Sequence, residues 1–249
     1  MDLWKQFRQS KLAYYLRRIR RRITPSYDPN QYWADQLGRF GPDLRGPGKG
    51  GLSEQENAEL YRHGEQALEK LTNMLKINWG GRFGEIGPGN GYWLNWLTQH
   101  RATDYTAFDI TDVLFPLLRE KWPHARLIRH DITMGPLPDN FDVLLMIDVT
   151  QHIMDEQGFT RAIANCRRAI KPGGHFLVTS WLQPYHQISE LEVMRPLKYY
   201  RKQFKGWQLT GPIAFRDKSL LAFTAPNNFQ DGRSAALSAI LTSFKRPSH

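Results

Sequence analysis

Residues 82–91 read Arg-Phe-Gly-Glu-Ile-Gly-Pro-Gly-Asn-Gly, and residues 92–97 continue as Tyr-Trp-Leu-Asn-Trp-Leu. The apolar run before the glycines predicts a strand, and the run after them predicts a helix. Gly87, Gly89 and Gly91 let the backbone of such a turn approach a ligand closely, and the free amides of a helix N-terminus attract an anionic group. The spacing is Gly-x-Gly-x-Gly, so it matches neither the dinucleotide fingerprint nor a P-loop.

Strand and helix patterns alternate after this turn. Strands are expected at 82–87, 104–110, 126–131, 141–148 and 175–181, and helices near 91–99, 112–121 and 155–170. Two further strands, 208–215 and 220–224, are separated by only four residues and predict a hairpin. We therefore expect an α/β fold: a doubly wound, seven-stranded, mostly parallel sheet with one antiparallel strand, Rossmann-like, with an N-terminal helical extension.

Carboxylates stand at or near the ends of four of these apolar strands: Glu85, Asp109, Asp131 and Asp148. Ligands of doubly wound sheets bind outside the carboxyl ends of the strands, so these acids are expected to line one site. Helix caps and turns also use single acids, and that alternative stays open for each of them.

The order and spacing of these features resemble the class I S-adenosylmethionine-dependent methyltransferases, of the small-molecule or glycan type. The similarity includes Glu85-x-Gly87-x-Gly89-x-Gly91, the acids that end the second and third strands, and the segments 141–148 and 170–177. The resemblance implies S-adenosylmethionine as cofactor and S-adenosylhomocysteine as product, with Asp109 binding the ribose hydroxyls and Asp131 facing the adenine amine. It implies a cofactor site made of Glu85, Gly87, Gly89, Gly91, Asp109, Ile110, Asp131, Ile132 and Asp148.

His152 follows the fourth strand in Val-Thr-Gln-His-Ile, residues 149–153. An imidazole titrates near neutrality, so this residue is the expected catalytic base, as in similar sugar O-methyltransferases. A packing or capping histidine is the alternative. Cys166 lies in an apolar helical stripe and is expected in the core, which excludes chemistry through a thiolate.

Polar and aromatic side chains of later loops and of the segment before the sheet are expected to wall the acceptor pocket. Arginine suits phosphate or carboxylate groups on an acceptor, although Arg216 could simply fix the hairpin turn. No metal site is predicted, and a metal held by Asp148 and Asp155 is the alternative. The expected substrate-binding residues are Tyr32, Trp33, Tyr185, His186, Arg195 and Arg216.

The positive charge is concentrated at the N-terminus. The 249 residues carry a net charge of +10, and residues 1–23 contain eight Lys or Arg and one Asp, so this arm carries +7 and the rest +3. Its apolar residues recur at three-to-five-residue intervals, which predicts a basic amphipathic helix that could lie on an anionic membrane. Packing on its own domain, or on a twin subunit in a homodimer, is the alternative, and nucleic acid is a weaker one.

Four segments are expected: the arm (1–24), a lid or linker with an N-terminal helix (25–76), the methyltransferase domain (77–226) and a weakly ordered tail (227–249). Residues 25–52 are rich in Gly and Pro and predict an irregular lid, and Ser53 with Glu56 forms a capping box that starts a helix running to about Lys76. A single cysteine excludes an internal disulfide. The chain has no secretory signal and no apolar run long enough to span a bilayer, so a cytoplasmic location is expected, with peripheral attachment to the inner membrane face.

The favoured function is O-methylation of a glycan or similar polar molecule, with the arm holding the enzyme where surface polysaccharide is built. Two alternatives remain. One is an RNA methyltransferase that uses the arginine-rich arm for phosphate contacts. The other is a non-catalytic, cofactor-binding partner protein that keeps the fold.

Overall fold

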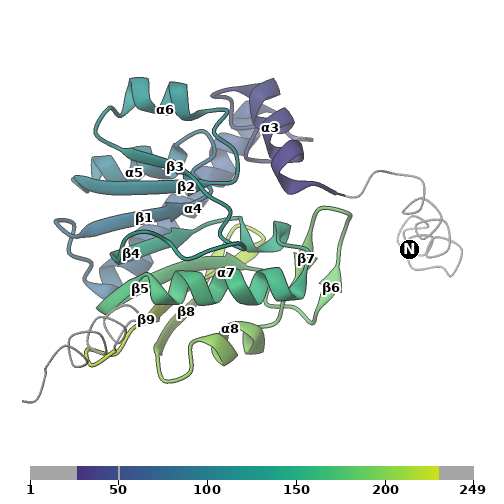
Figure 1. Ribbon diagram of the computed structural model, residues 1–249. Helices are drawn as coiled ribbons and strands as arrows, with labels where there is room; N and C mark the ends of the chain where they lie inside the picture. The colour runs from purple at the N-terminus through teal and green to yellow at the C-terminus, as the bar shows by residue number, and fades with distance from the viewer. Residues whose placement is uncertain (1–26, 50, 230–249) are drawn as a thin grey trace, which may run out of the picture.

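The computed structural model describes residues 27–49 and 51–229, and its centre is one seven-stranded sheet (Figure 1). The strand order is β3-β2-β1-β4-β5-β9-β8. The strands are β1 (Arg82–Ile86), β2 (Asp104–Asp109), β3 (Arg126–Arg129), β4 (Phe141–Met146), β5 (Ile170–Ser180), β8 (Gln208–Phe215) and β9 (Lys218–Thr224).

Strand β9 is the antiparallel member of this sheet. It runs against both β5 and β8, whereas β3, β2, β1, β4 and β5 pair in parallel. The predicted fold class is therefore confirmed. Strand β5 begins at Ile170, five residues earlier than expected, because the segment predicted as a turn pairs with β4 through a register shift between Phe141 and Val143.

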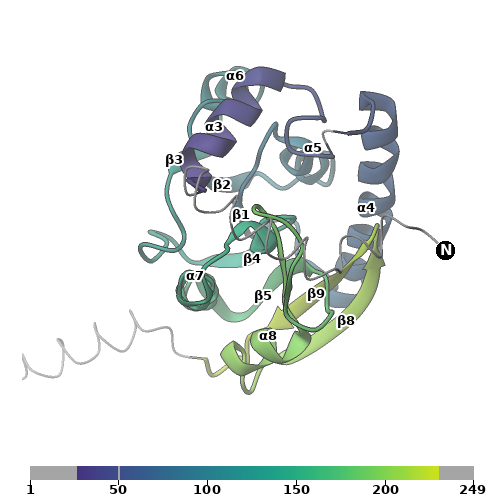
Figure 2. The ribbon, with the colours of Figure 1, turned by 90° about the vertical axis from the view of Figure 1, so that its right-hand side faces the viewer.

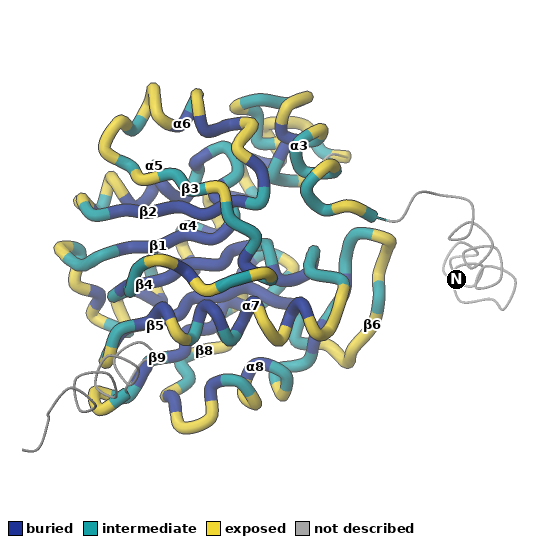
Figure 3. Tube along the Cα trace, viewed as in Figure 1, coloured by how far each residue is buried: buried dark blue, intermediate teal, exposed yellow. Residues whose placement is uncertain are grey.

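Helices cover both faces of the sheet (Figure 2). On one face, α7 (Glu156–Arg168) and α8 (Leu197–Gln203) pack in a core cluster that includes Phe159, Cys166 and Tyr200. On the other, α4 (Glu54–Leu75) and α5 (Tyr92–Gln99) pack in a second cluster with Leu68 and Trp93. The short α6 (Phe115–Lys121) follows β2. The buried strands lie between these layers (Figure 3), and Cys166 is fully buried, as predicted.

The capping box at the start of α4 is confirmed. The Glu56 amide donates to Ser53 Oγ at 3.2 Å, and Glu56 Oε2 accepts from the Ser53 amide at 2.8 Å. Two of the amides that have no partner within the helix are thereby satisfied, which fixes where the helix begins.

The prediction of an irregular segment over 25–52 is wrong in its first half. Helix α3 spans Pro29–Phe40, and Asp28 caps it by accepting from the amides of Asn30 and Gln31 at 2.9 and 3.3 Å. An acidic N-cap followed by proline at the first helical position is a start signal, since proline lacks only a hydrogen that would be unpaired there. Gly41, at φ 55°, ends the helix, and the rest of the segment consists of turns, as expected.

The sequence also failed to indicate α8 and a small hairpin made of β6 (His186–Gln187) and β7 (Val193–Met194). In Figure 1 this hairpin and α3 lie at the same end of the strands of the main sheet. The basic arm and nearly all of the predicted tail fall outside the residues that the structure describes, as does any membrane contact of residues 1–23. In the part of the chain that is described, no helix combines the length and the apolar character needed to cross a bilayer.

Candidate active site

A cavity of about 320 Å³ opens at the carboxyl ends of β1, β2 and β4, beneath α3. Its volume is at the lower end of the range typical of small-molecule sites, and its position is the one that doubly wound sheets use for ligands. The predicted residues that line it are Trp33, Gly87, Gly89, Asp109, Ile110, Asp131, Ile132, Asp148 and His152.

The glycine turn contributes bare backbone to the cavity. Gly87 and Gly89 line it and have φ values of 73° and 54°, a region that side chains of L-residues disfavour. Gly91, at φ 81°, has a different role, because a Cβ there would lie 2.6 Å from the Trp122 ring and 2.7 Å from Leu118. The structure thus assigns Gly91 to the packing of α5 against α6 rather than to the cavity wall.

Asp109 places a carboxylate at the end of β2. It is 9% exposed and accepts from the Thr111 amide at 3.1 Å. Burial raises the pKa of Asp109 to about 6, although the amides of Thr111, Gly89 and Ile110 favour the ionised form. This acid is therefore ionised at neutral pH and can accept hydrogen bonds from ligand hydroxyls.

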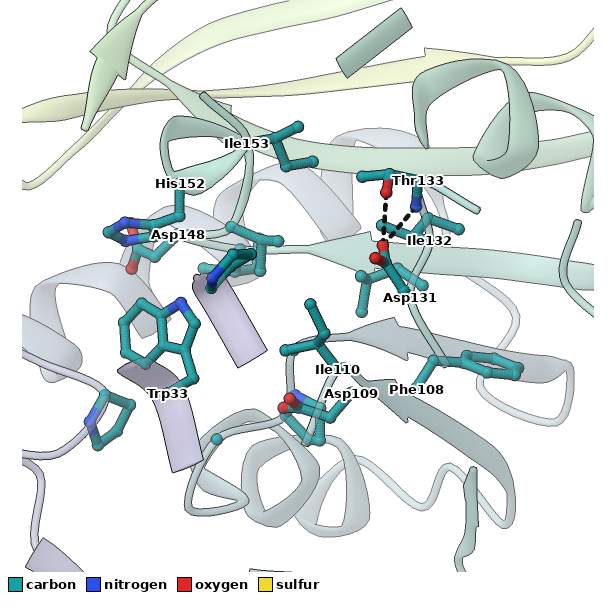
Figure 4. A pocket seen from close by; sticks show the side chains of 18 of the residues that line it. Trp33, Phe108, Asp109, Ile110, Asp131, Ile132, Thr133, Asp148, His152 and Ile153 are labelled. Atoms are coloured by element: carbon teal, nitrogen blue, oxygen red, sulfur yellow. Dashed lines mark hydrogen bonds between the residues drawn. The ribbon is translucent and has the colours of Figure 1, made fainter. Parts of the chain in front are cut away.

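Asp131 and three isoleucines form the next part of the wall (Figure 4). One oxygen of Asp131, Oδ1, accepts from the amide and the hydroxyl of Thr133 at 2.8 and 2.7 Å. This arrangement holds the carboxyl in one orientation. Ile110, Ile132 and Ile153 surround it with apolar surface, which suits a flat base such as adenine.

Glu85 lies outside the cavity lining. Its side chain is buried, its Oε2 accepts a short hydrogen bond from the Tyr105 hydroxyl, and burial raises its pKa to about 7. Oε1 has no hydrogen-bond partner among the described residues. The structure places this acid beneath the glycine turn, so the predicted direct contact with a ligand finds no support in the cavity lining.

His152 ends the short 3₁₀ turn η1 (Thr150–His152) and lines the opposite side of the cavity. Its Nδ1 lies 2.9 Å from the Leu191 carbonyl oxygen, in the β6–β7 hairpin. Burial lowers the pKa of His152 from 6.5 to about 4, and the Leu191 carbonyl offsets this only in part. The ring is therefore neutral at pH 7 and able to accept a proton.

Asp148 forms ion pairs with two basic side chains of the β8–β9 hairpin. Its carboxylate pairs closely with Arg216 and lies 2.7 Å from Lys218 Nζ, and the side chains of the two cations are 6% and 7% exposed. Asp148 itself has φ 58°, and its amide donates to Thr179 Oγ1 at 2.8 Å. A carboxylate held in this way is not free to bind a metal, and Asp155 is used as the N-cap of α7.

Helix α3 and the loop after it close the cavity from the other side. Trp33 meets His152 edge-on, with ring centroids 4.9 Å apart. The Asn90 side-chain amide donates to the Pro42 carbonyl oxygen at 2.8 Å, which joins this loop to the glycine turn. The structure places Trp33 on the cavity wall, whereas Tyr32 packs behind it with ring centroids 5.1 Å apart.

The remaining predicted substrate residues do not line this cavity. Tyr185 and His186 are exposed on the β6–β7 hairpin, and Arg216 lies behind Asp148 and Tyr61. Arg195 is only 1% exposed and donates to backbone carbonyls, so its prediction as an acceptor ligand is corrected. A charged residue in a loop suggests exposure, but the fold encloses this one completely.

Several lining residues were missed by sequence reasoning. Tyr27 and Leu37 come from α3 and the residues before it, and Tyr61 comes from α4. The Asp28-Pro29 cap and the Trp33–Leu37 spacing of four were the available signals for a helix with one apolar face. Phe108 and Ile153 are sequence neighbours of predicted residues, but their apolar side chains gave no sequence signal for a ligand site.

The known proteins to which this chain is similar are methyltransferases. The family model "Methyltransferase domain" matches residues 84–178, from the glycine turn to β5. A probable S-adenosylmethionine-dependent methyltransferase of Mycolicibacterium smegmatis is 29% identical over 131 residues, or 52% of this chain and 48% of the relative. Phthiotriol/phenolphthiotriol dimycocerosates methyltransferase 1 of Mycobacterium ulcerans is 32% identical over 118 residues, or 45% and 42%.

These alignments leave much of each protein unmatched, since this chain spans less than half the length of the curated relatives. Among solved structures, the S-adenosylmethionine-bound amino pentose methyltransferase CalS10 of Micromonospora echinaspora superimposes with a TM-score of 0.56 at 14% identity. The match covers 70% of this chain and 97% of CalS10. At that identity the likeness concerns the fold.

Proposed function

We propose that the chain is a class I S-adenosylmethionine-dependent methyltransferase that methylates a hydroxyl of a glycan or similar polar small molecule. One observation carries the proposal: the glycine turn, Asp109 and His152 all line the same cavity. A nucleotide-type site and a neutral base therefore face one space. Methyl transfer to a hydroxyl oxygen, which must lose its hydrogen, uses such an arrangement of cofactor and base.

The residues present fit the cofactor. Gly87 and Gly89 leave room for its amino-acid portion, since side chains are absent where the backbone meets the cavity. Asp109, ionised at pH 7, would accept hydrogen bonds from the ribose hydroxyls. Asp131, held by Thr133, would face the adenine edge between Ile110 and Ile132.

When bound, S-adenosylmethionine would supply an electrophilic methyl group, whose carbon would bond to the acceptor oxygen as the C–S bond breaks and leaves its electron pair on the thioether sulfur. His152 takes the proton that the acceptor hydroxyl loses, so that the oxygen is neutral after it gains the methyl group. With a pKa of about 4, the ring is neutral at pH 7, so its lone pair is free, although the burial that lowers the pKa also makes the ring a weaker base than a free imidazole.

A sugar-like acceptor suits the side of the cavity that α3 closes. The Trp33 ring lies against His152 and offers the aromatic surface on which the apolar face of a sugar ring packs. The structural neighbour CalS10 acts on an amino pentose, so a sugar acceptor is compatible with this fold. A glycan hydroxyl held against Trp33 would be within reach of the imidazole.

Replacement of His152 by alanine tests the proposed function. The full chain is incubated with methyl-labelled S-adenosylmethionine and a panel of mono- and oligosaccharides, and products that gain one methyl group are identified by mass spectrometry. His152→Ala should lower turnover about 100-fold or more, because proton transfer in the transition state is lost. Affinity for S-adenosylhomocysteine, measured by calorimetry, should be retained.

The matched control is His175→Ala, which removes a half-buried histidine of β5 whose Nδ1 lies 2.9 Å from Thr224 Oγ1, away from the cavity lining. This variant should turn over normally. Unchanged turnover in His152→Ala would contradict the role of the base. Failure of the chain to bind either form of the cofactor would remove the proposal as a whole.

A further inference from the structure

Arg195 is a buried cation whose hydrogen-bond and ring contacts among the described residues are with uncharged groups. The side chain is 1% exposed, Nη1 donates to the Thr150 carbonyl at 3.0 Å, and Nη2 donates to the Ile153 carbonyl at 2.5 Å. Its guanidinium also lies over the Phe159 ring at 4.2 Å. Within residues 27–49 and 51–229, no carboxylate comes within ion-pair distance of it. A buried charge is costly unless it is well hydrogen-bonded, so this arrangement requires a reason.

The two carbonyls that Arg195 holds bracket His152. Thr150 opens the η1 turn and Ile153 follows His152 directly, so one planar guanidinium spans the turn. Thr150 is fixed from two other sides, because its hydroxyl donates to the Thr179 carbonyl at 3.0 Å and accepts from Tyr200 at 3.0 Å. The backbone around His152 is therefore unusually constrained.

Two contacts define the protonation of the His152 ring. A carbonyl oxygen can only accept, so the atom that faces Leu191, Nδ1, carries the hydrogen. The Gln151 side-chain nitrogen can only donate, and it lies 3.3 Å from His152 Nε2 while also donating to the Asp148 carbonyl at 2.8 Å. Nε2 is therefore the atom without a hydrogen, and an acceptor hydroxyl must displace the 3.3 Å Gln151 contact to reach its single lone pair.

Leu191 and Arg195 belong to the same hairpin. Leu191 lies in the loop between β6 and β7, and Arg195 follows β7 directly. The hairpin thus contributes both the carbonyl that selects the tautomer and the cation that fixes the turn carrying the ring. The two contacts can form together only if the turn and the hairpin keep one relative position.

We propose that Arg195 is a positioning residue, which fixes η1 against the hairpin so that Leu191 holds His152 in the Nδ1–H tautomer with Nε2 as the proton acceptor. This inference rests on the proposed function, in which Nε2 receives the acceptor proton. A lysine would supply a point donor in place of a fork and could not span both carbonyls in the same geometry. Lysine would keep the positive charge, but it would not hold the Thr150 and Ile153 carbonyls together as the guanidinium does.

The tautomer can be measured without knowing the acceptor. Nitrogen NMR on the full chain with isotope-labelled histidine, in the presence of S-adenosylhomocysteine, reports which ring nitrogen carries the hydrogen at pH 7, and His152→Gln assigns the signal. The wild-type ring should be Nδ1–H. In Arg195→Met most of the population should change to Nε2–H, because the Leu191 contact is no longer enforced.

Arg167→Met is the matched control, since it removes another guanidinium stacked on aromatic rings, those of Trp207 and Phe229, at the far end of α7. It should leave the His152 signal unchanged. Arg195→Lys, which keeps the buried charge, covers the case in which Arg195→Met fails to fold, and it should give a mixture of tautomers. A His152 ring that remains Nδ1–H in a folded Arg195 variant would overturn the inference.

Turnover separates this inference from the proposed function. With a saccharide acceptor from the panel, Arg195→Met should lower kcat about tenfold or more in the wild-type background. In the His152→Ala background it should add little, because both changes remove the same proton transfer. Equal losses in both backgrounds would show a general structural role and overturn the inference, whereas unchanged turnover in His152→Ala alone would contradict the proposed base and, with it, any catalytic role for Arg195.

Discussion

The two sides of the cavity are built differently. The two acids of the cofactor side, which is made of residues 87–91, 109–111 and 131–133, are held by local contacts: the Thr111 amide bonds to Asp109 and the Thr133 amide to Asp131, each two residues apart. A distant contact on this side joins Asn90 to Pro42. The acceptor side, made of residues 148–153, is held by partners 29 to 70 residues away. These partners are Thr179, Leu191, Arg195, Tyr200, Arg216 and Lys218.

This difference shows how one fold can keep its cofactor and change its acceptor. A site whose geometry comes from a turn and two strand ends forms whenever those strands pair. A site whose geometry depends on a hairpin and a distant turn can be altered by changes in either segment while the cofactor side is untouched. The three predictions below test whether the two sides are separable in this way.

The largest effect is expected for Asp148→Asn. The substitution leaves Arg216 and Lys218, both nearly buried, without their carboxylate, and it introduces no backbone strain because asparagine tolerates a positive φ. Removal of one partner from a buried ion pair costs about 3 kcal/mol or more. Urea unfolding of the full chain at pH 7 measures the loss in free energy of unfolding.

Glu59→Gln is the control, since it breaks an ion pair with Arg62 in which both side chains are about two-thirds exposed. That change should alter the free energy of unfolding by less than about 1 kcal/mol. A similarly small effect in Asp148→Asn would show that the acceptor side does not depend on this cluster.

The next effect is expected for Asp109→Ala, on the cofactor side. Loss of two hydrogen bonds to an ionised carboxylate should reduce affinity for S-adenosylhomocysteine about 100-fold. Calorimetry gives the Kd. Asp112→Ala, which removes a 59%-exposed acid three residues later, should change Kd by less than about twofold, and an equal effect of the two variants would remove Asp109 from the site.

The smallest effect concerns pH. Burial raises the pKa of Asp109 to about 6, and a ribose hydroxyl donates to the ionised form, so affinity for S-adenosylhomocysteine should fall as the pH drops below about 6. The limiting slope for one proton is about tenfold per pH unit. Asp109→Asn should abolish the slope, whereas Glu85→Gln should keep it, since Glu85 does not line the cavity.

The sequence predicted much of the fold because strand and helix periodicity is local. The strand that carries Asp109 was placed to within one residue, and the capping box of Ser53 and Glu56 was found from spacing alone. Helix α3 was missed because the Gly- and Pro-rich composition of residues 25–52 outweighed the Asp28-Pro29 start signal. Local rules conflicted there, and packing of Leu37 and Trp33 over the cavity decided the outcome.

The acceptor side could be predicted only in part. His152 was placed in the correct loop, yet Arg195 was expected to bind the acceptor, and its real partners lie 42 and 45 residues earlier in the chain. Arg216 likewise was expected at the pocket and instead pairs with Asp148, 68 residues away. Charge in a loop predicts exposure on average, and only the folded chain shows which charges are enclosed.

By itself, the amino-acid sequence determined the sheet, the glycine turn and the acids at its rim, since these depend on backbone preferences and on residues two to ten positions apart. Only the tertiary structure decided that Trp33 covers His152, that Asp148 is neutralised by the last hairpin, and that Nε2 is the basic atom of the histidine. The reason is that a buried polar group takes its pKa and its orientation from whichever partners packing brings within about 3 Å.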